Sequence, residues 1–219
     1  MTPSAELARI RLNPHHRAVQ RDLRDATEMH RTLMRMIPDD LGDTPRRDTG
    51  FLFRIDESDE HSTVLVQATV PLDRTNLPTG YGDVHIKQLK PMFDALRPGL
   101  AVRYRIIVNP AKRERLPLEQ KNKRGKVVAL IGAEADRWWA RRATEAGLHL
   151  NSMIPTPVRS VHPQGRNAPP VRHSLIRYDG TATVTDPEAL TQALLSGIGR
   201  GKPYGAGLLS LAPATATAV

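Results

Sequence analysis

Two stretches with nearly the same pattern decide the fold of this chain: residues 5–14 read AELARIRLNP and residues 100–110 read LAVRYRIIVNP. In each, apolar side chains largely alternate with basic ones, and the pattern stops at an Asn-Pro pair. Such a period of two is typical of a strand that buries one face. The repetition about 95 residues apart predicts two units of similar size in this chain.

Between these stretches, the sequence predicts a helix, a hairpin and a second helix. Asp25-Ala-Thr-Glu28 has the spacing of a capping box and begins a helix over about 26–37, whose apolar stripe contains Met29, Leu33 and Met36. The two strands of the hairpin are expected at 51–55 and 63–69. A weaker helix near 86–97 ends at Arg97-Pro98-Gly99, where we place a domain boundary.

The second half repeats this plan with longer connections. Its strand-like segments cover 126–131, 150–160, 171–178, 181–185 and 207–211. A helix is predicted over 133–147, with Trp139, Ala143 and Ala146 on one side. Tyr178-Asp-Gly-Thr181 indicates a tight turn. Asp186-Pro-Glu188 begins the clearest helix of the chain, which ends at Gly197.

These elements predict an α+β protein made of two tandem ferredoxin-like (RRM-like) domains, each in a βαββαβ-like order. We expect the domains to cover 1–97 and 100–213, followed by a flexible tail at 214–219. An antiparallel sheet with packed helices presents an open sheet face, or a cleft between the two units. Such a surface suits RNA.

Composition excludes several classes of protein. The chain has no cysteine, so a disulfide framework, a zinc–thiolate site, an iron–sulfur cluster and a cysteine nucleophile are impossible. The apolar runs fall far short of the ~20 residues that span a bilayer. The first residues also lack the basic-then-apolar order of a signal peptide. We therefore expect a soluble, cytoplasmic protein with no membrane association.

Positive charge is concentrated in the second half of the chain. Residues 1–100 carry 14 Lys+Arg against 15 Asp+Glu, whereas residues 101–219 carry 18 against 8. The whole net charge of +9 therefore comes from the second half. This asymmetry favours a polyanionic partner for that half, although a merely basic solvated surface is the alternative.

A glycine-rich segment follows the last predicted helix. Residues 196–213 read SGIGRGKPYGAGLLSLAP, with five glycines between 197 and 207. Glycines let the backbone approach a ligand closely, and Arg200 and Lys202 add positive charge. The order helix, loop, strand, with Pro203 after Lys202, argues against a nucleotide P-loop. By itself the loop fits a structural turn as well as an anion site.

The wording of this segment closely resembles the C-terminal glycine-rich motif of the CasE family, the CRISPR precursor-RNA endoribonucleases of type I-E Cascade systems. Further segments match that family in the same order: Leu12-Asn-Pro14, Arg21-Asp-Leu23, Glu28-Met-His-Arg-Thr-Leu33, Arg103-Tyr-Arg105 and Asn109-Pro-Ala-Lys112. The resemblance covers about 5–213 and implies two tandem ferredoxin-like domains, in agreement with the pattern above.

The resemblance also implies a function. Members of the family bind the repeat hairpin of a CRISPR transcript, cut it once at the 3′ base of the stem and stay bound to the crRNA beside other Cascade subunits. Their reaction needs no metal and no cofactor: a 2′-hydroxyl attacks the adjacent phosphate and leaves a 2′,3′-cyclic phosphate and a 5′-hydroxyl. Such chemistry needs a group that moves protons near neutral pH, together with positive charge at the phosphate.

The catalytic histidine of the family falls at His30, where general base and general acid are both open roles. Helical spacing places Thr27, Arg31 and Arg35 close enough to frame a polar face with it, so these four are the candidate catalytic residues. Well-known members carry a tyrosine three residues before the histidine. Here that residue is Thr27, whose hydroxyl is shorter and less acidic. Either Arg31, Arg35 or the loop of Lys202 compensates, or the enzyme is slower.

RNA affinity is expected chiefly from the second half, because the stem of A-form RNA is read through phosphates, 2′-hydroxyls and shape. The candidate RNA-binding residues are Arg159, Arg166, Arg172, Arg177, Gly199, Arg200, Gly201 and Lys202. The loop from Lys112 to Lys126 is the competing candidate. His15 and His16 could also reach the site, but we favour the interpretation that they are exposed loop residues. Few aromatics argue against stacking on a single strand. In the basic second half, the ones expected outside helix or core positions are Tyr104, Tyr178 and Tyr204.

Two alternative functions stay open. The first is a structural guide-RNA-binding subunit without catalysis, which Thr27 in place of tyrosine favours. The second and remoter one is a generic basic RRM-like RNA binder.

Overall fold

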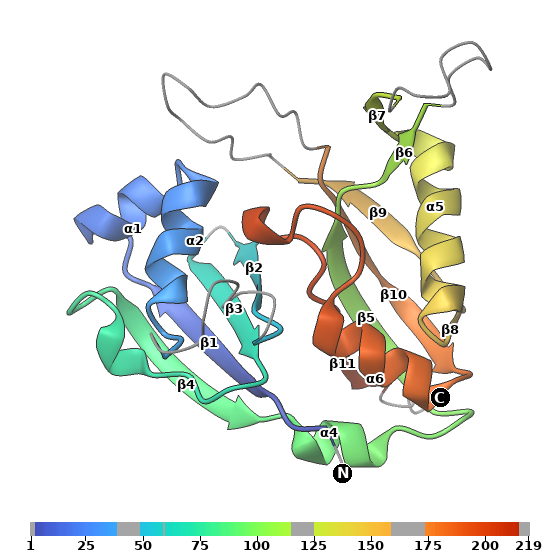
Figure 1. Cartoon of the computed structure of the whole chain (residues 1–219), viewed down its shortest axis with the longest axis horizontal. Helices are drawn as coiled ribbons and strands as arrows, with labels where there is room; N and C mark the ends of the chain where they lie inside the picture. Colours follow the sequence, from blue (N-terminus) through green and yellow to red (C-terminus); the bar gives the residue numbers. More distant parts are fainter. Residues whose placement is uncertain (1–2, 39–48, 59, 115–124, 159–173, 215–219) are drawn as a thin grey trace.

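The computed structural model describes residues 3–38, 49–58, 60–114, 125–158 and 174–214. Two antiparallel sheets, each with its own helices, stand side by side (Figure 1). In the first, the strands are β1 (Glu6–Leu12), β2 (Leu52–Glu57), β3 (Ser62–Ala68) and β4 (Gly82–Gln88). They are ordered β2-β3-β1-β4, the ferredoxin-like order, so the predicted fold class is confirmed for this half.

Helix α2 (Ala26–Met34) covers the inner face of this sheet. Its residues Met29 and Leu33 are fully buried, as the apolar stripe predicts. The Asp25 carboxylate accepts a hydrogen bond from the Thr27 backbone N–H at 2.8 Å, which confirms Asp25 as the N-cap. The helix ends at Met34, and Met36 continues the buried stripe in the turn beyond it.

Three elements of the first half differ from the sequence prediction. A short helix α1 (Arg17–Asp22) precedes α2. The sequence does not predict it, because Val19 is the one buried apolar side chain among its six residues. Residues 86–88 belong to strand β4, so the predicted helix of 86–97 shortens to α4 (Lys90–Ala95). A 3₁₀ turn η1 (Arg74–Asn76) takes the place of the second crossover helix. Alternating Val84 and Ile86 explain the strand.

The second sheet contains β5 (Ala101–Val108), β8 (Leu148–Leu150), β10 (Ile176–Val184) and β11 (Ser210–Pro213), in the order β11-β5-β10-β8. Strand β9 (Ile154–Pro157) pairs with the other end of β10. Helices α5 (Gly132–Glu145) and α6 (Pro187–Ser196) pack on one face. A separate hairpin joins β6 (Ala111–Arg113) to β7 (Val127–Ala129). This half has the same ferredoxin-like order.

The predicted tight turn at Tyr178-Asp-Gly-Thr181 is wrong, because β10 runs straight through it. Gly180 serves a different purpose there. A Cβ atom at this position would lie 2.1 Å from the carbonyl oxygen of Ser152, so glycine is needed for a close backbone approach and not for a turn.

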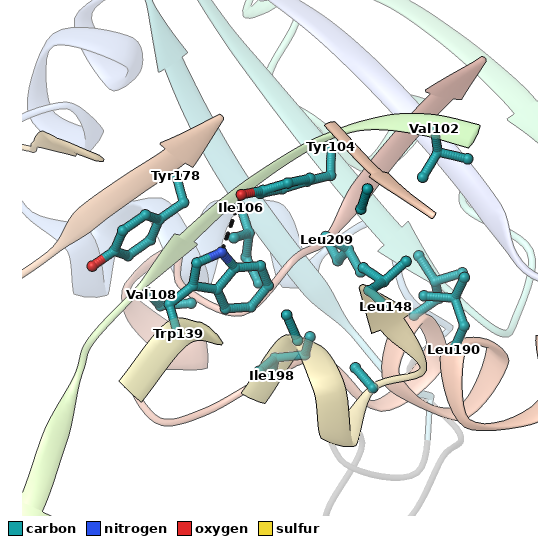
Figure 2. Packing of buried hydrophobic residues seen from close by; sticks show 14 of the residues in the cluster. Val102, Tyr104, Ile106, Val108, Trp139, Leu148, Tyr178, Leu190, Ile198 and Leu209 are labelled. Carbon is teal, nitrogen blue, oxygen red and sulfur yellow. Dashed lines mark hydrogen bonds between the residues drawn. The ribbon is translucent and has the colours of Figure 1, made fainter. Parts of the chain in front are cut away.

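Aromatic side chains contact one another within the largely aliphatic core of the second domain (Figure 2). Trp139 of α5 stacks on Tyr178 with 5.9 Å between ring centroids, and its indole Nε1 donates to the Tyr104 hydroxyl at 3.4 Å. Both tyrosines are buried, so the expectation that they lie outside the core is wrong. Phe93 of α4 joins the same core, while the boundary at 97–99 stays a prediction.

The two sheets meet along β2. The guanidinium of Arg54 is buried and donates to the carbonyl oxygen of Arg105 and to the hydroxyl of Ser210, across the two sheets. Gln67 of β3 donates from Nε2 to the carbonyl oxygen of Leu194 at 2.7 Å. These side chains fix how α2 lies relative to the glycine-rich segment. Within the described part of the chain, none of the helices has the length and apolar character that a bilayer crossing requires.

Candidate active site

His30 lies on α2, one turn beyond the N-cap, and is held against two phenylalanines of the β2 region. Its imidazole meets Phe51 edge-on, with ring centroids 5.8 Å apart, and lies 6.2 Å from the centroid of Phe53. The side chain is half-buried, and its Nε2 atom is withdrawn from solvent. Packing against the two phenylalanines therefore fixes the orientation of the imidazole. A residue that transfers protons at a defined position requires such a fixed orientation.

The other three candidate catalytic residues are exposed on α2 or at its C-cap. Thr27 is exposed in the first turn, and Arg35 is exposed at the C-cap. The Arg31 guanidinium forms an ion pair with the carboxylate of Glu28. The structure thus places the four candidates on α2 and its C-cap, with the His30 side chain less exposed than the other three.

A cluster of polar side chains joins α1 to α2. Arg21 of α1 donates to the carboxylate of Asp22 and to the hydroxyl of Thr32 in α2, at 2.9 and 3.2 Å. It also lies 3.4 Å from the Glu28 carboxylate, which in turn holds Arg31. The hydrogen bond to Asp22 raises the pKa of Arg21. Arg21 therefore links α1 to α2 and orients the carboxylate that positions Arg31.

The glycine-rich segment crosses from the second domain toward α2 (Figure 1). Its 3₁₀ turn η3 (Lys202–Tyr204) packs against α2 and β2. The glycines on each side of the turn, Gly201 and Gly205, have φ angles of 86° and 80° in the left-handed region. A Cβ atom at Gly205 would lie 3.3 Å from the Phe53 ring. The glycines thus let the turn pack closely beside the phenylalanines that hold His30.

Backbone hydrogen bonds show how the segment is built. Tyr204 N–H donates to the carbonyl of Gly201, and Gly207 N–H donates to that of Ile107 in β5. Ile198 N–H donates to the carbonyl of Gly207. Because these N–H groups bond within the protein, the predicted anion site depends on Gly199, Gly201 and the side chains of Arg200 and Lys202. RNA binding by these four residues stays a prediction.

A cleft of about 190 Å³ lies between the two domains beside η3. Ala26 of α2 and Phe53 of β2 line one wall, and Arg177 of β10 lines the other. Tyr204 and Gly205 close it on the side of the glycine-rich segment. The first turn of the histidine helix, the aromatic support of His30 and a cation of the second domain thus line one cavity. A cleft between the two units is one of the two RNA-suited surfaces expected from the sequence.

Of the predicted RNA-binding residues on the basic segment, Arg177 alone lies within the described residues. Its Nε donates to the carboxylate of Asp179 at 2.8 Å, and Arg105 lies 2.5 Å from the same carboxylate. Arg159, Arg166 and Arg172 lie outside the described residues. Of the competing loop, the two ends are described: Lys112 lies 3.2 Å from Glu134, and Arg113 donates to the carbonyl of Gly125 at 2.6 Å.

His15 and His16 lie at the N-terminus of α1. His16 is the N-cap, whose Nδ1 accepts from the Ala18 N–H at 3.2 Å, and its ring lies 6.0 Å from that of Tyr81. Neither histidine lines the cleft; His30 does not line it either, but its ring contacts the lining residue Phe53. Three residues beside the histidine helix are not singled out by sequence reasoning as site residues: Phe51, Phe53 and Tyr204. No local pattern marks them, because contacts between distant segments bring them to α2.

Together, the double ferredoxin-like fold and the histidine-bearing helix beside a glycine-rich turn define a protein of two tandem RRM-like domains. Residues 7–213 match the family described as CRISPR associated protein, and the chain belongs to this family. It is 34% identical over 94% of its length to the CRISPR-associated endoribonuclease Cse3 of Thermus thermophilus, of which 99% is covered. It is 26% identical over 87% of its length to the Cascade subunit CasE of Escherichia coli K12, of which 93% is covered.

Solved structures of related proteins have the same fold as this chain. A structure of the CRISPR endoribonuclease Cse3 bound to a 19-nucleotide RNA matches with a TM-score of 0.78 and 34% identity, covering 95% of this chain and 100% of that one. The Cas6e protein of E. coli K12 matches with a TM-score of 0.69 and 27% identity, covering 95% and 99%. Both confirm the fold that the sequence pattern predicts.

Proposed function

We propose that this chain is a CRISPR precursor-RNA endoribonuclease that binds the repeat hairpin, cuts it at the 3′ base of the stem and stays bound to the crRNA with other Cascade subunits. The observation that carries the proposal is His30, fixed on Phe51 and Phe53 next to the interdomain cleft. The near-complete match to relatives named as endoribonucleases supports it. So does the solved structure of Cse3 with an RNA that represents a pre-cleavage complex.

The chemistry we propose is a transesterification without a metal ion. The 2′-oxygen upstream of the cut forms a bond to the phosphorus while the bond to the 5′-oxygen breaks. One proton leaves the 2′-hydroxyl and one reaches the departing 5′-oxygen, and His30 carries one of these two transfers. The phosphate gains charge in the transition state, and Arg31, Arg35, Arg200 and Lys202 are the cations proposed to offset it.

The deciding experiment compares His30→Ala with His15→Ala on the cognate repeat RNA. His15 is exposed at the start of α1, so its loss removes a histidine outside the cleft. We expect His30→Ala to lower the single-turnover rate by at least about 100-fold and His15→Ala to leave it unchanged. RNA affinity should be equal in both. If both variants cut as fast as the wild type, the assignment of His30 is wrong.

Two substrates test the mechanism. Cleavage should continue in excess EDTA, and a 2′-deoxy nucleotide just upstream of the cut should abolish it, because the attacking group is then missing. Cutting of the deoxy substrate at the same bond would contradict the transesterification.

The second candidate function is a guide-RNA-binding subunit without catalysis. Thr27 favours it, since the exposed first turn of α2 carries only a short hydroxyl at this position. This alternative predicts tight binding of the repeat hairpin and intact RNA after long incubation. Equal affinity for unrelated stems would instead favour a generic RNA binder.

A further inference from the structure

The four tyrosines of the chain differ sharply in where they lie. Tyr81 and Tyr178 are 1% and 0% exposed, and each donates to a carboxylate at 2.8 Å, Asp22 and Asp136 respectively. Tyr104 is 3% exposed and donates to the carbonyl oxygen of Ser152 at 3.1 Å. Burial raises the pKa of all three phenols. These three hydroxyls are therefore part of the structure of the cores.

Tyr204 is different, because it is half-buried and lines the interdomain cleft. Across the cleft from the second domain lie Ala26, at the start of the histidine helix, and Phe53, which holds the His30 ring. Arg177 lines the same cavity. Tyr204 thus lines the same cavity as the first turn of α2. On the wall formed by the first domain, neither Ala26 nor Phe53 has a side-chain hydrogen-bond donor.

The backbone holds Tyr204 in this position. Its N–H donates to the carbonyl of Gly201 at 2.8 Å, and the Gly205 N–H donates to the carbonyl of Lys202 at 3.2 Å. The left-handed φ angles of Gly201 and Gly205 bracket the turn, and Pro203 fixes its middle. A side chain presented on such a constrained turn needs little reorganisation when a substrate arrives, which is what stabilisation of a transition state requires.

Given the proposed function, on which this inference rests, we infer that Tyr204 is a further catalytic residue, whose hydroxyl donates a hydrogen bond to a non-bridging oxygen of the scissile phosphate. A phenol hydroxyl is a hydrogen-bond donor. It therefore strengthens its bond as the phosphate oxygens gain charge, without competing for the proton that His30 transfers. Stacking of the ring on a nucleobase is the competing role.

Tyr204→Phe and Tyr204→Ala separate these roles, with Tyr104→Phe as a control that removes a tyrosine hydroxyl away from the cleft. Single-turnover cleavage is measured at saturating protein, and affinity is measured with the uncleavable 2′-deoxy repeat. We expect Tyr204→Phe to cut at least about tenfold more slowly with affinity within about twofold of the wild type, and Tyr104→Phe to cut at the wild-type rate. Full activity of Tyr204→Phe with weak binding by Tyr204→Ala would overturn the inference in favour of stacking.

Sulfur substitution adds a readout that a merely structural role would not change. Each of the two non-bridging oxygens at the cut is replaced by sulfur in turn, and the ratio of the two cleavage rates is taken. We expect the wild type to discriminate between the two substrates and Tyr204→Phe to lose most of that discrimination. An unchanged ratio overturns the contact. If the wild type cuts no RNA at all, the proposed function fails instead, so the two failures are distinguishable.

Discussion

The Nη1 atom of Arg54 lies 3.0 Å from the carbonyl oxygen of Arg105, so the edge strand of the first sheet donates directly to the backbone of a central strand in the second. The same guanidinium pairs with both carboxylate oxygens of Asp56 at 2.9 Å and is 2% exposed. Asp56 lies 3.8 Å from the Arg105 guanidinium, which pairs with Asp179. Asp179 also holds Arg177, which lines the cleft. A continuous chain of charges therefore connects the domain joint to the candidate site.

Removal of Arg54 should weaken this joint. Arg54→Ala leaves Asp56 and the carbonyl of Arg105 without their buried partner, and breaking a buried pair in this way costs about 3 kcal/mol. We expect the free energy of unfolding in urea to fall by that amount, and cleavage to slow because α2 and η3 lose their fixed relation. Arg9→Ala, which removes an exposed arginine from the same sheet, is the control. Equal urea midpoints for the two variants would contradict the role of the joint.

Gly205 allows a matched test of how the glycine-rich segment packs. Gly205 and Gly99 both have a φ angle of 80°, so alanine at either position costs about 1–2 kcal/mol of backbone strain. A Cβ atom at Gly205 would press on the Phe53 ring at 3.3 Å, whereas Gly99 has open space around it. We expect both variants to lose similar stability, and Gly205→Ala alone to cut RNA more slowly. Equal cleavage rates would mean that the packing of Phe53 does not affect His30.

Alkaline pH should destabilise the protein in a predictable direction. Burial raises the pKa of Tyr81 and Tyr178 above the ordinary tyrosine value of about 10. Above that pH, the unfolded chain loses phenol protons that the folded chain retains, so stability is full below about pH 10 and falls as the pH rises further.

Urea unfolding of the wild type and of Tyr178→Phe between pH 8 and pH 11.5 checks this direction. The variant has one phenol fewer to titrate, so its fall above about pH 10 should be shallower, even though its stability at neutral pH is lower. Parallel curves for the two proteins would show that Tyr178 ionises equally in both states.

The fold was largely predictable because its signals are local. Alternation in 5–12 and 100–108 and the Asp25 and Asp186 caps depend only on neighbouring residues, and the structure confirms them. The errors arose where tertiary contacts decide. The sequence pattern predicts a turn at Gly180, because it cannot show that the Ser152 carbonyl approaches this residue. Likewise, strand β4 is stabilised by its pairing with β1, which overrides the weak helical pattern of 86–97.

The candidate site was predictable only in part. The family motif indicates His30, and helical spacing indicates its candidate neighbours, since all four residues lie within nine residues of sequence. The sequence could not reveal Phe51, Phe53 and Tyr204, because β2 and η3 reach α2 from positions far along the chain. That three of the four tyrosines are committed to the cores was equally hidden, and only the hydrogen bonds of the folded chain reveal it.

Thr27→Tyr tests whether the first turn of α2 limits catalysis. Thr27 is exposed at the N-terminal end of the histidine helix, next to Ala26 of the cleft wall, so a tyrosine there places a longer hydroxyl at the rim. One added hydrogen bond to the reacting phosphate is worth about 1 kcal/mol, which corresponds to about a fivefold faster single-turnover rate. Thr144→Tyr, at an exposed position on α5, is the control. A rate gain confined to Thr27→Tyr would identify this position as the weak point of the active site. An unchanged rate would mean that groups already in the cleft, with Tyr204 foremost, supply the contact that a tyrosine at position 27 would make.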